Sequence, residues 1–107
     1  MGYQLRYAKS ANKQFDDIQR KDAAKHRKVV KCLRKLAEDP KQSGLNFHKY
    51  DSMLGPNGEE VWESYAENKA PAAWRVFWCY GPDEREGNDP KGAVVKIITV
   101  VAITPHP

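Results

Sequence analysis

The sequence has little cysteine, no long apolar run and no recognisable leader, and each absence narrows what the chain can be. Only two cysteines, Cys32 and Cys79, occur among the 107 residues. They are too few and too far apart for a disulfide framework or a zinc site, so we expect two packed thiols and neither a metal nor another cofactor. No stretch is long and apolar enough to cross a membrane, and Met1 is not followed by a signal-peptide pattern. We therefore expect a soluble cytoplasmic protein with no membrane partner.

Internal repeats and low-complexity tracts are also absent, and the length suits one domain, residues 1–107, with a single modest core. The net charge of +4 is unevenly distributed along this chain. Residues 1–39 contain eleven Lys and Arg against five Asp and Glu, whereas residues 40–107 contain seven against nine. The positive first part indicates an anionic partner, of which nucleic acid is the commonest.

Two apolar runs in the second half of the sequence predict a pair of strands. Residues 74–80 read WRVFWCY, and residues 93–103 are rich in β-branched side chains. The twelve residues between them, GPDEREGNDPKG, are rich in turn formers, which predicts an antiparallel hairpin. Arg75 is the one charge inside the first run. Because an unpaired buried charge is costly, Arg75 must be paired or must face a cleft.

The position of the turn decides which residues lie near Arg75. A turn at residues 88–90, the densest turn signal, puts Arg75 opposite Ile103, and His106 then lies roughly 10 Å further along the strand. If all twelve residues form a loop, Arg75 pairs near Ile98 and His106 is far away. We expect the first register, in which Arg75 and His106 reach the same substrate.

The rest of the sequence predicts two helices and further strands. YQLRY, residues 3–7, alternates as a first strand, and Ser10 and Asp22 suit the N-caps of two successive amphipathic helices. Residues 40–58 lack a clear period, although LNFHKYD within them is either a short strand or an ordered loop. VWESYAE, residues 61–67, predicts another strand. The expected fold is α+β, with an N-terminal strand, a helical hairpin and then an antiparallel three-stranded meander.

This order resembles the RelE/ParE toxin superfamily of type II toxin–antitoxin systems. The residues that carry the resemblance are LNFHKYDSM, VWESY leading into WRVFWCY, and the ending ITVVAITPHP. The resemblance implies a toxin that a cognate antitoxin protein neutralises. RelE-like members cleave messenger RNA in the ribosomal A site, whereas ParE-like members inhibit DNA gyrase without cleaving RNA. The sequence departs from the family at Ser64 and Tyr65, where members often have an arginine.

A metal-free ribonuclease must deprotonate a ribose 2′-hydroxyl, protonate the leaving 5′-oxygen and stabilise the phosphorane between them. Histidine suits the proton transfers and arginine suits the phosphate. With the family pattern, Arg75 is predicted to contact the phosphate and His106 to act as general acid or base. His48 or Glu63 is predicted to be the complementary group. The alternatives are a cross-strand ion pair between Arg75 and Glu63, and an ordinary exposed residue or RNA contact at His48.

Basic residues of the second helix and of the stretch after it are candidates for RNA contact. Neutralising phosphates gives affinity that does not depend on base sequence. The candidate set is Lys28, Lys31, Arg34, Lys35, Lys49 and Tyr50. A solvated surface is the alternative for each of them. We expect a toxin that cleaves messenger RNA on the ribosome, with messenger and ribosomal RNA as partners; the alternatives are a gyrase inhibitor and a degenerate RNA-binding domain.

Overall fold

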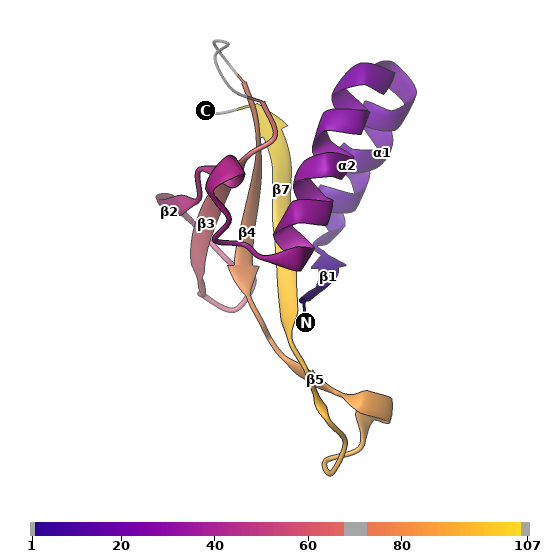
Figure 1. Ribbon diagram of the computed structural model, residues 1–107, viewed down its shortest axis with the longest axis vertical. Coiled ribbons are helices and arrows are strands. Elements are labelled where there is room, and N and C mark those ends of the chain that lie inside the picture. The colour runs from indigo at the N-terminus through magenta and orange to yellow at the C-terminus, as the bar shows by residue number, and fades with distance from the viewer. Residues whose placement is uncertain (1, 68–72, 106–107) are drawn as a thin grey trace.

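The computed structural model describes residues 2–67 and 73–105, which form a twisted sheet with two helices on one face (Figure 1). In chain order the elements are β1 (Gln4–Tyr7), α1 (Lys9–Lys21), α2 (Ala23–Glu38), η1 (Ser43–Leu45), β2 (His48–Leu54), β3 (Glu60–Tyr65), β4 (Trp74–Tyr80), β5 (Glu84–Arg85), η2 (Glu86–Asn88), β6 (Val94–Val95) and β7 (Ile97–Pro105). The predicted α+β fold is confirmed. None of the helices in the described part of the chain has the length and apolar character needed to cross a membrane.

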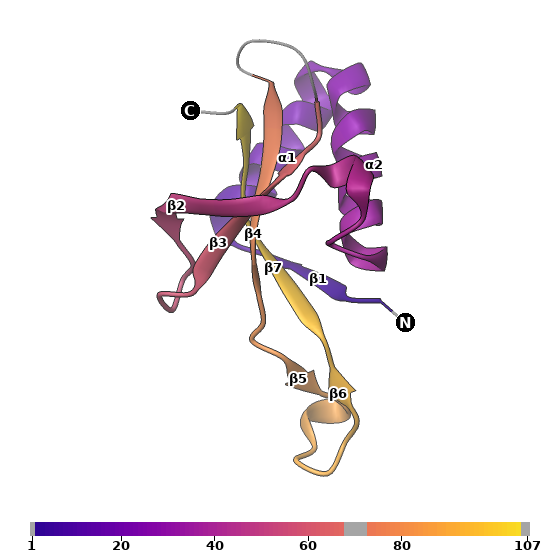
Figure 2. The same cartoon turned by 60° about the vertical axis from the view of Figure 1, so that its left-hand side comes forward.

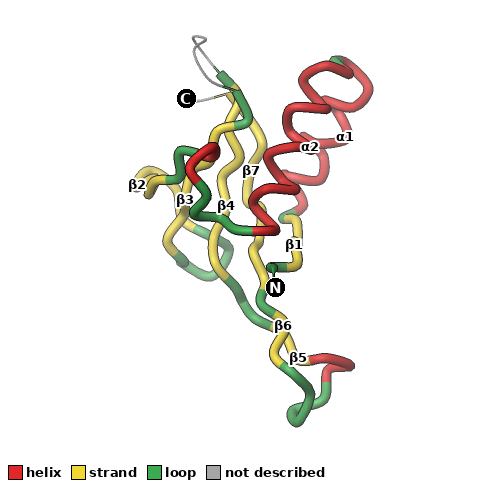
Figure 3. The backbone as a smooth tube through the Cα atoms, viewed as in Figure 1, coloured by secondary structure: helices red, strands yellow, loops and turns green. Residues whose placement is uncertain are grey.

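The main sheet has five strands in the order β1-β7-β4-β3-β2, and Figure 3 shows both helices on one side of it. β1 runs parallel to β7, while the other neighbouring strands are antiparallel. The meander therefore has four strands rather than the predicted three. The additional strand is β2, which begins at His48 inside the LNFHKYD stretch. It forms because His48 and the two following residues pair with β3.

The pairing of β4 with β7 corrects the predicted register by one residue. Arg75 lies opposite Thr104, not Ile103. A bulge interrupts this pairing, and a bulge shifts register in a way that alternation of apolar residues does not reveal. The alternative register is also wrong, because Ile98 pairs with Tyr80 at the other end of β4. Beyond that end, β5 and β6 form a small separate hairpin that projects away from the main sheet (Figure 2).

The two helices begin in different ways. The Asp22 carboxylate accepts a hydrogen bond from the Lys25 backbone N–H at 3.0 Å, so the predicted cap of α2 is confirmed. The predicted cap of α1 is wrong. α1 starts at Lys9, after Ala8, and the Ser10 hydroxyl instead donates to the Val101 carbonyl at 3.1 Å. That hydroxyl attaches the helix to β7, a contact between residues distant in sequence.

The two faces of the sheet have separate apolar cores. On the helix side, the fully buried Trp78 donates from its indole nitrogen to the Ser64 hydroxyl at 2.9 Å, so a polar group inside the core has its partner. This larger core consists of Ala11, Ile18, Val29, Cys32, Leu33, Leu36, Leu45, Val76, Trp78, Ile98, Val100 and Ile103. The opposite face has a smaller core of Val61, Phe77 and Ala102, against which Tyr50, Met53 and Val101 pack. Because α1 and α2 both lie on the other side of the sheet, this second face is not covered by them (Figure 3).

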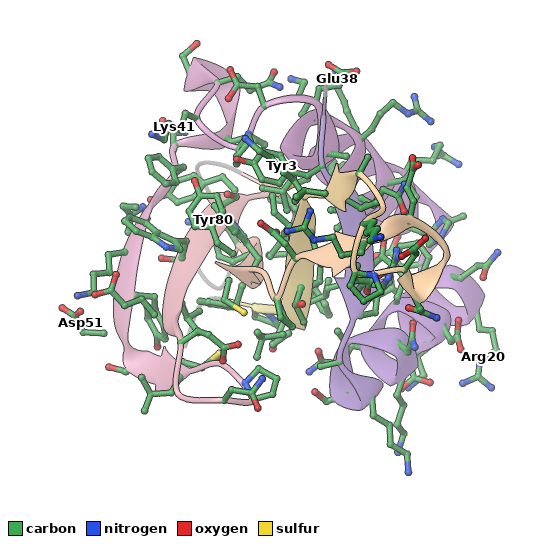
Figure 4. The ribbon with its side chains drawn as sticks, turned by 90° about the horizontal axis from the view of Figure 1, so that it is seen from below. Tyr3, Arg20, Glu38, Lys41, Asp51 and Tyr80 are labelled. Carbon is green, nitrogen blue, oxygen red and sulfur yellow. The ribbon has the colours of Figure 1, made fainter. Side chains whose placement is uncertain are left out.

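Contacts fix the end of the sheet from which the β5–β6 hairpin projects. Tyr3 and Tyr80 pack there with ring centroids 6.0 Å apart, and Figure 4 shows the two side chains close together. The Arg6 guanidinium donates two hydrogen bonds to the Glu84 carboxylate, at 2.8 and 3.1 Å. β1 and the hairpin are thereby connected at one end of the molecule, leaving the other end of β4 for the cluster described next.

Candidate active site on the helix-free face of the sheet

Three of the predicted catalytic residues come together on neighbouring strands. His48 of β2 is paired with Glu63 of β3, and Tyr65 of β3 is paired with Arg75 of β4. Paired residues project to the same face of a sheet, as do residues two apart on one strand. All four side chains therefore share one face. It is the face of Phe77, which is paired with Glu63 and belongs to the smaller core, away from the helices.

Glu63 is the centre of this cluster. Its side chain is fully buried, with 0% of the residue exposed. Oε1 lies 2.6 Å from Nε2 of His48, and Oε2 lies 3.6 Å from Nε of Arg75. A buried carboxylate needs such positive neighbours because desolvation of the charge is otherwise too costly. The sequence left a cross-strand ion pair between Arg75 and Glu63 as the alternative to a catalytic role for Arg75. This contact is present, and Glu63 also contacts His48.

Arg75 is held in one orientation by several contacts. Nη1 donates to the backbone carbonyls of Glu67 at 2.5 Å and Trp74 at 3.3 Å. The guanidinium carbon lies 3.6 Å from the centroid of the Tyr65 ring, in cation–π geometry. With only 9% of the residue exposed, the guanidinium is largely desolvated. It is therefore a fixed positive charge rather than a mobile surface group.

His48 is the accessible member of the cluster, with 47% of its side chain exposed. Nδ1 lies 2.9 Å from the Asn46 carbonyl oxygen, while Nε2 faces the Glu63 carboxylate. Both neighbours are acceptors, so both contacts are favourable when each ring nitrogen carries a proton. In that form His48 and Arg75 provide two positive charges around one carboxylate. The cluster then has a net charge of +1, and His48 is the member that solvent or substrate can reach.

His106, the predicted general acid or base, lies outside the described residues. Its proximity to Arg75 remains a prediction. The sequence analysis did not assign a role to Tyr65, which contacts two members of the cluster: Arg75 through its ring face and His48 edge-on, with ring centroids 5.7 Å apart. One signal in the sequence could have drawn attention to Tyr65: it stands where members of the family that the sequence resembles often have an arginine.

Three of the predicted RNA contacts are gathered at one place on α2. Lys28, Lys31 and Lys35 line a cavity of about 150 Å³ between α2, η1 and the end of β3. Arg34 lines a different depression along α2, together with Lys31. Lys28 also contacts the Glu67 carboxylate at 3.2 Å. The basic face of α2 is therefore divided into two regions rather than forming one uniform stripe.

The two remaining RNA candidates lie on β2 and have protein partners. The Lys49 ammonium contacts Glu60 at 3.1 Å and Asp51 at 3.6 Å. Tyr50 is half-buried and packs on Phe77, with ring centroids 4.9 Å apart. The structure does not bring either residue into the lysine-lined cavity.

The sequence matches no protein-family model and no curated protein. Among solved structures, the chain is similar to a YoeB/ParE toxin from Agrobacterium tumefaciens. The two share 14% sequence identity, and the alignment covers 97% of this chain and 99% of that chain with a TM-score of 0.65. At such low identity the likeness concerns the three-dimensional fold. The chain has the RelE/ParE-like toxin fold that the sequence resemblance implied.

Proposed function

We propose that this chain is the toxin of a type II toxin–antitoxin system and that it is a metal-free endoribonuclease acting on messenger RNA at the ribosome. The observation that carries the proposal is the Glu63 carboxylate held between His48 and Arg75 on the helix-free face of the sheet. The fold likeness to a YoeB/ParE toxin supports the toxin assignment and, with it, an antitoxin partner.

Each member of the cluster suits one part of RNA cleavage. Arg75 is a permanent cation whose orientation is fixed before substrate binds, as stabilisation of a phosphorane requires. His48 is the exposed member of the cluster, and an imidazole suits a general acid for the leaving 5′-oxygen. Glu63 is too deeply buried to meet the substrate, so its role is to orient His48 and Arg75. The general base for the 2′-hydroxyl is predicted to be His106.

Expression of the chain without its antitoxin tests this function. The wild-type protein is expected to arrest growth and to cut messenger RNA. His48→Gln should lower cleavage by about 10²- to 10⁴-fold, the range for loss of a proton-transfer group. Arg75→Ala should lower it by about 10²- to 10³-fold, the range for loss of one group that stabilises transition-state charge. The matched control is His26→Gln, because His26 packs on Phe15 of α1, with ring centroids 4.7 Å apart, and has no contact with the cluster. His26→Gln should cleave as the wild type does.

Plasmid supercoiling measured in the same cells separates the proposal from gyrase inhibition. Growth arrest with intact messenger RNA and loss of supercoiling would contradict the ribonuclease and favour a ParE-like inhibitor. Harmless expression of a folded wild-type chain would contradict both forms of toxin. Circular dichroism of each purified variant establishes that loss of cleavage is not loss of folding.

A further inference from the structure

We propose that the cavity between α2 and the η1–β3 region is a binding site for one phosphate group, and that in the cell it holds a backbone phosphate of the bound RNA. We call this cavity the lysine pocket; it is lined by Lys28, Lys31, Cys32, Lys35, Gly44, Leu45, Tyr65 and Ala66. The RNA identity of the phosphate rests on the proposed ribonuclease function. The phosphate chemistry rests on the pocket itself.

The charge of the pocket has one sign. Lys28, Lys31 and Lys35 are spaced by three and four residues, which places them on the same side of α2. No Asp or Glu is among the residues that line the pocket. Lys28 is paired with Glu67 just outside the pocket, but the neighbouring ammonium groups of Lys31 and Lys35 repel each other, and an anion bound between them reverses that repulsion.

Two of these lysines have no partner within the described part of the chain. Lys28 contacts Glu67, but no carboxylate there pairs with the ammonium of Lys31 or Lys35. Lys35 is also half-buried. A Cβ atom added to Gly44 would lie 3.4 Å from Nζ of Lys35. The ammonium is therefore packed against the Gly44 backbone rather than extended into solvent. A partly desolvated ammonium without a partner is costly, which favours an anionic ligand at this position.

The size of the pocket and the type of its donors favour phosphate. Its volume of about 150 Å³ is well below the roughly 300 to 1,000 Å³ of ordinary small-molecule sites, which excludes a nucleoside. Each ammonium is a compact charge with three N–H donors, and several such groups suit a tetrahedral anion with acceptor oxygens in different directions.

The pocket and the catalytic cluster meet at one residue, Tyr65, the last residue of β3. Tyr65 lines the pocket, and its ring carries the Arg75 guanidinium at 3.6 Å. An RNA strand that passes around the end of β3 from one face of the sheet to the other can place one phosphate at Arg75 and another in the pocket. Filling both sites fixes the position of the strand, so that the correct phosphodiester lies at the cluster.

Binding of two probes to the full chain, measured by amide chemical shifts, tests the site. The probes are inorganic phosphate and a 2′-O-methylated RNA tetranucleotide, which lacks the nucleophile and is not cut. The variant is Lys31→Gln/Lys35→Gln. Its control is Lys9→Gln/Lys13→Gln, which removes the same charge from exposed positions of α1. In wild type and control, both probes should shift the Gly44 and Ala66 amides. The pocket variant should lose these shifts and bind the tetranucleotide about tenfold more weakly, as expected for lost hydrogen bonds to a charged group.

The salt dependence of tetranucleotide binding gives an independent readout. Because both lysines contact one phosphate, the pocket variant should lower the slope of log affinity against log salt by about 0.7, the value for one phosphate on a single strand. A decrease of about 1.4 would mean two separate surface contacts and would overturn the shared site. Equal affinities for the pocket variant and its control would overturn it as well.

The two proposals fail in different ways. If phosphate binds in the pocket but the tetranucleotide does not displace it, the RNA part of the inference is wrong. Pocket binding by both probes, with messenger RNA left intact by the wild-type protein in cells, would contradict the ribonuclease and support the phosphate site. Normal cleavage by a pocket variant that binds RNA as the control does would contradict the phosphate site and support the ribonuclease.

Discussion

The guanidinium of Arg75 stacks on the ring of Tyr65, 3.6 Å from its centroid, and the two residues are direct cross-strand partners. Tyr65 also meets the His48 ring edge-on. One aromatic ring therefore contacts both the fixed cation of Arg75 and the ring of His48. In the proposed ribonuclease, Tyr65 would act through these neighbours, as a positioning residue.

Removal of the Tyr65 ring should lower cleavage through Arg75. Tyr65→Ala is expected to reduce kcat about thirtyfold, because a desolvated cation–π contact contributes on the order of 2 kcal/mol. Tyr65→Phe keeps the ring and should retain cleavage. Single-turnover cleavage assays distinguish the two variants. An equal loss in both would show that the hydroxyl, rather than the stacked ring, is the important part of Tyr65.

Replacement of Glu63 should destabilise the fold. Glu63→Gln leaves the Arg75 guanidinium beside a buried neutral side chain, and loss of one partner of a buried ion pair costs about 3 kcal/mol or more. The matched control is Glu60→Gln, because Glu60 is exposed and pairs with Lys49 at the surface, so that its loss should cost less than about 1 kcal/mol. Urea denaturation measures both free energies of unfolding.

A second substitution checks the cause of that loss. Glu63→Gln/Arg75→Gln should be less destabilising than the sum of the two single changes, because it removes the stranded cation together with its partner. Additive losses would show that the Glu63–Arg75 contact contributes no coupling energy.

The Glu67 carboxylate should make the folded protein less stable at acidic pH. Burial works to raise the pKa of its carboxyl, but the Trp74 backbone N–H together with Lys25 and Lys28 outweighs burial and holds the pKa below its usual value of 4.5. A pKa lowered by folding stabilises the protein above 4.5, and this contribution is lost as pH falls through the folded-state value.

The Glu67 contribution can be measured by comparison with Glu67→Gln. The wild type should be more stable than this variant at pH 7, and the difference in unfolding free energy should shrink as the pH falls below about 4.5. Glu38→Gln, at an exposed position in α2, should show no such narrowing. A difference that stays constant from pH 7 to pH 3 would contradict the role of Glu67.

Both cysteines should be unreactive in the folded protein. They are free and buried, which confirms the prediction of packed thiols. Burial raises the pKa of Cys32 to about 12, and burial with nearby Glu59 raises that of Cys79 to about 11. Because the thiolate is the nucleophile, iodoacetamide at pH 8 should modify neither residue until urea unfolds the chain. A Ser52→Cys variant, with its thiol at an exposed position, provides the reactive control. Rapid modification of the native wild type would contradict this burial.

The sequence by itself determined the element types and their order. Apolar periodicity is a local property, so residues 74–80 were identified as a strand, and Asp22 was identified as the cap of the second helix. The additional strand β2 was harder to predict because its sequence, HKYDSML, has few apolar residues. Its pairing with β3 depends on neighbours supplied by another part of the chain.

The tertiary structure decided which residues meet. A bulge shifted Arg75 from Ile103 to Thr104, and the Ser10 hydroxyl bonded to β7 instead of capping its own helix. The pairing of β2, β3 and β4 then placed His48, Glu63 and Arg75 in one cluster. Register and burial come from contacts between distant segments, which the pattern of any single segment does not contain.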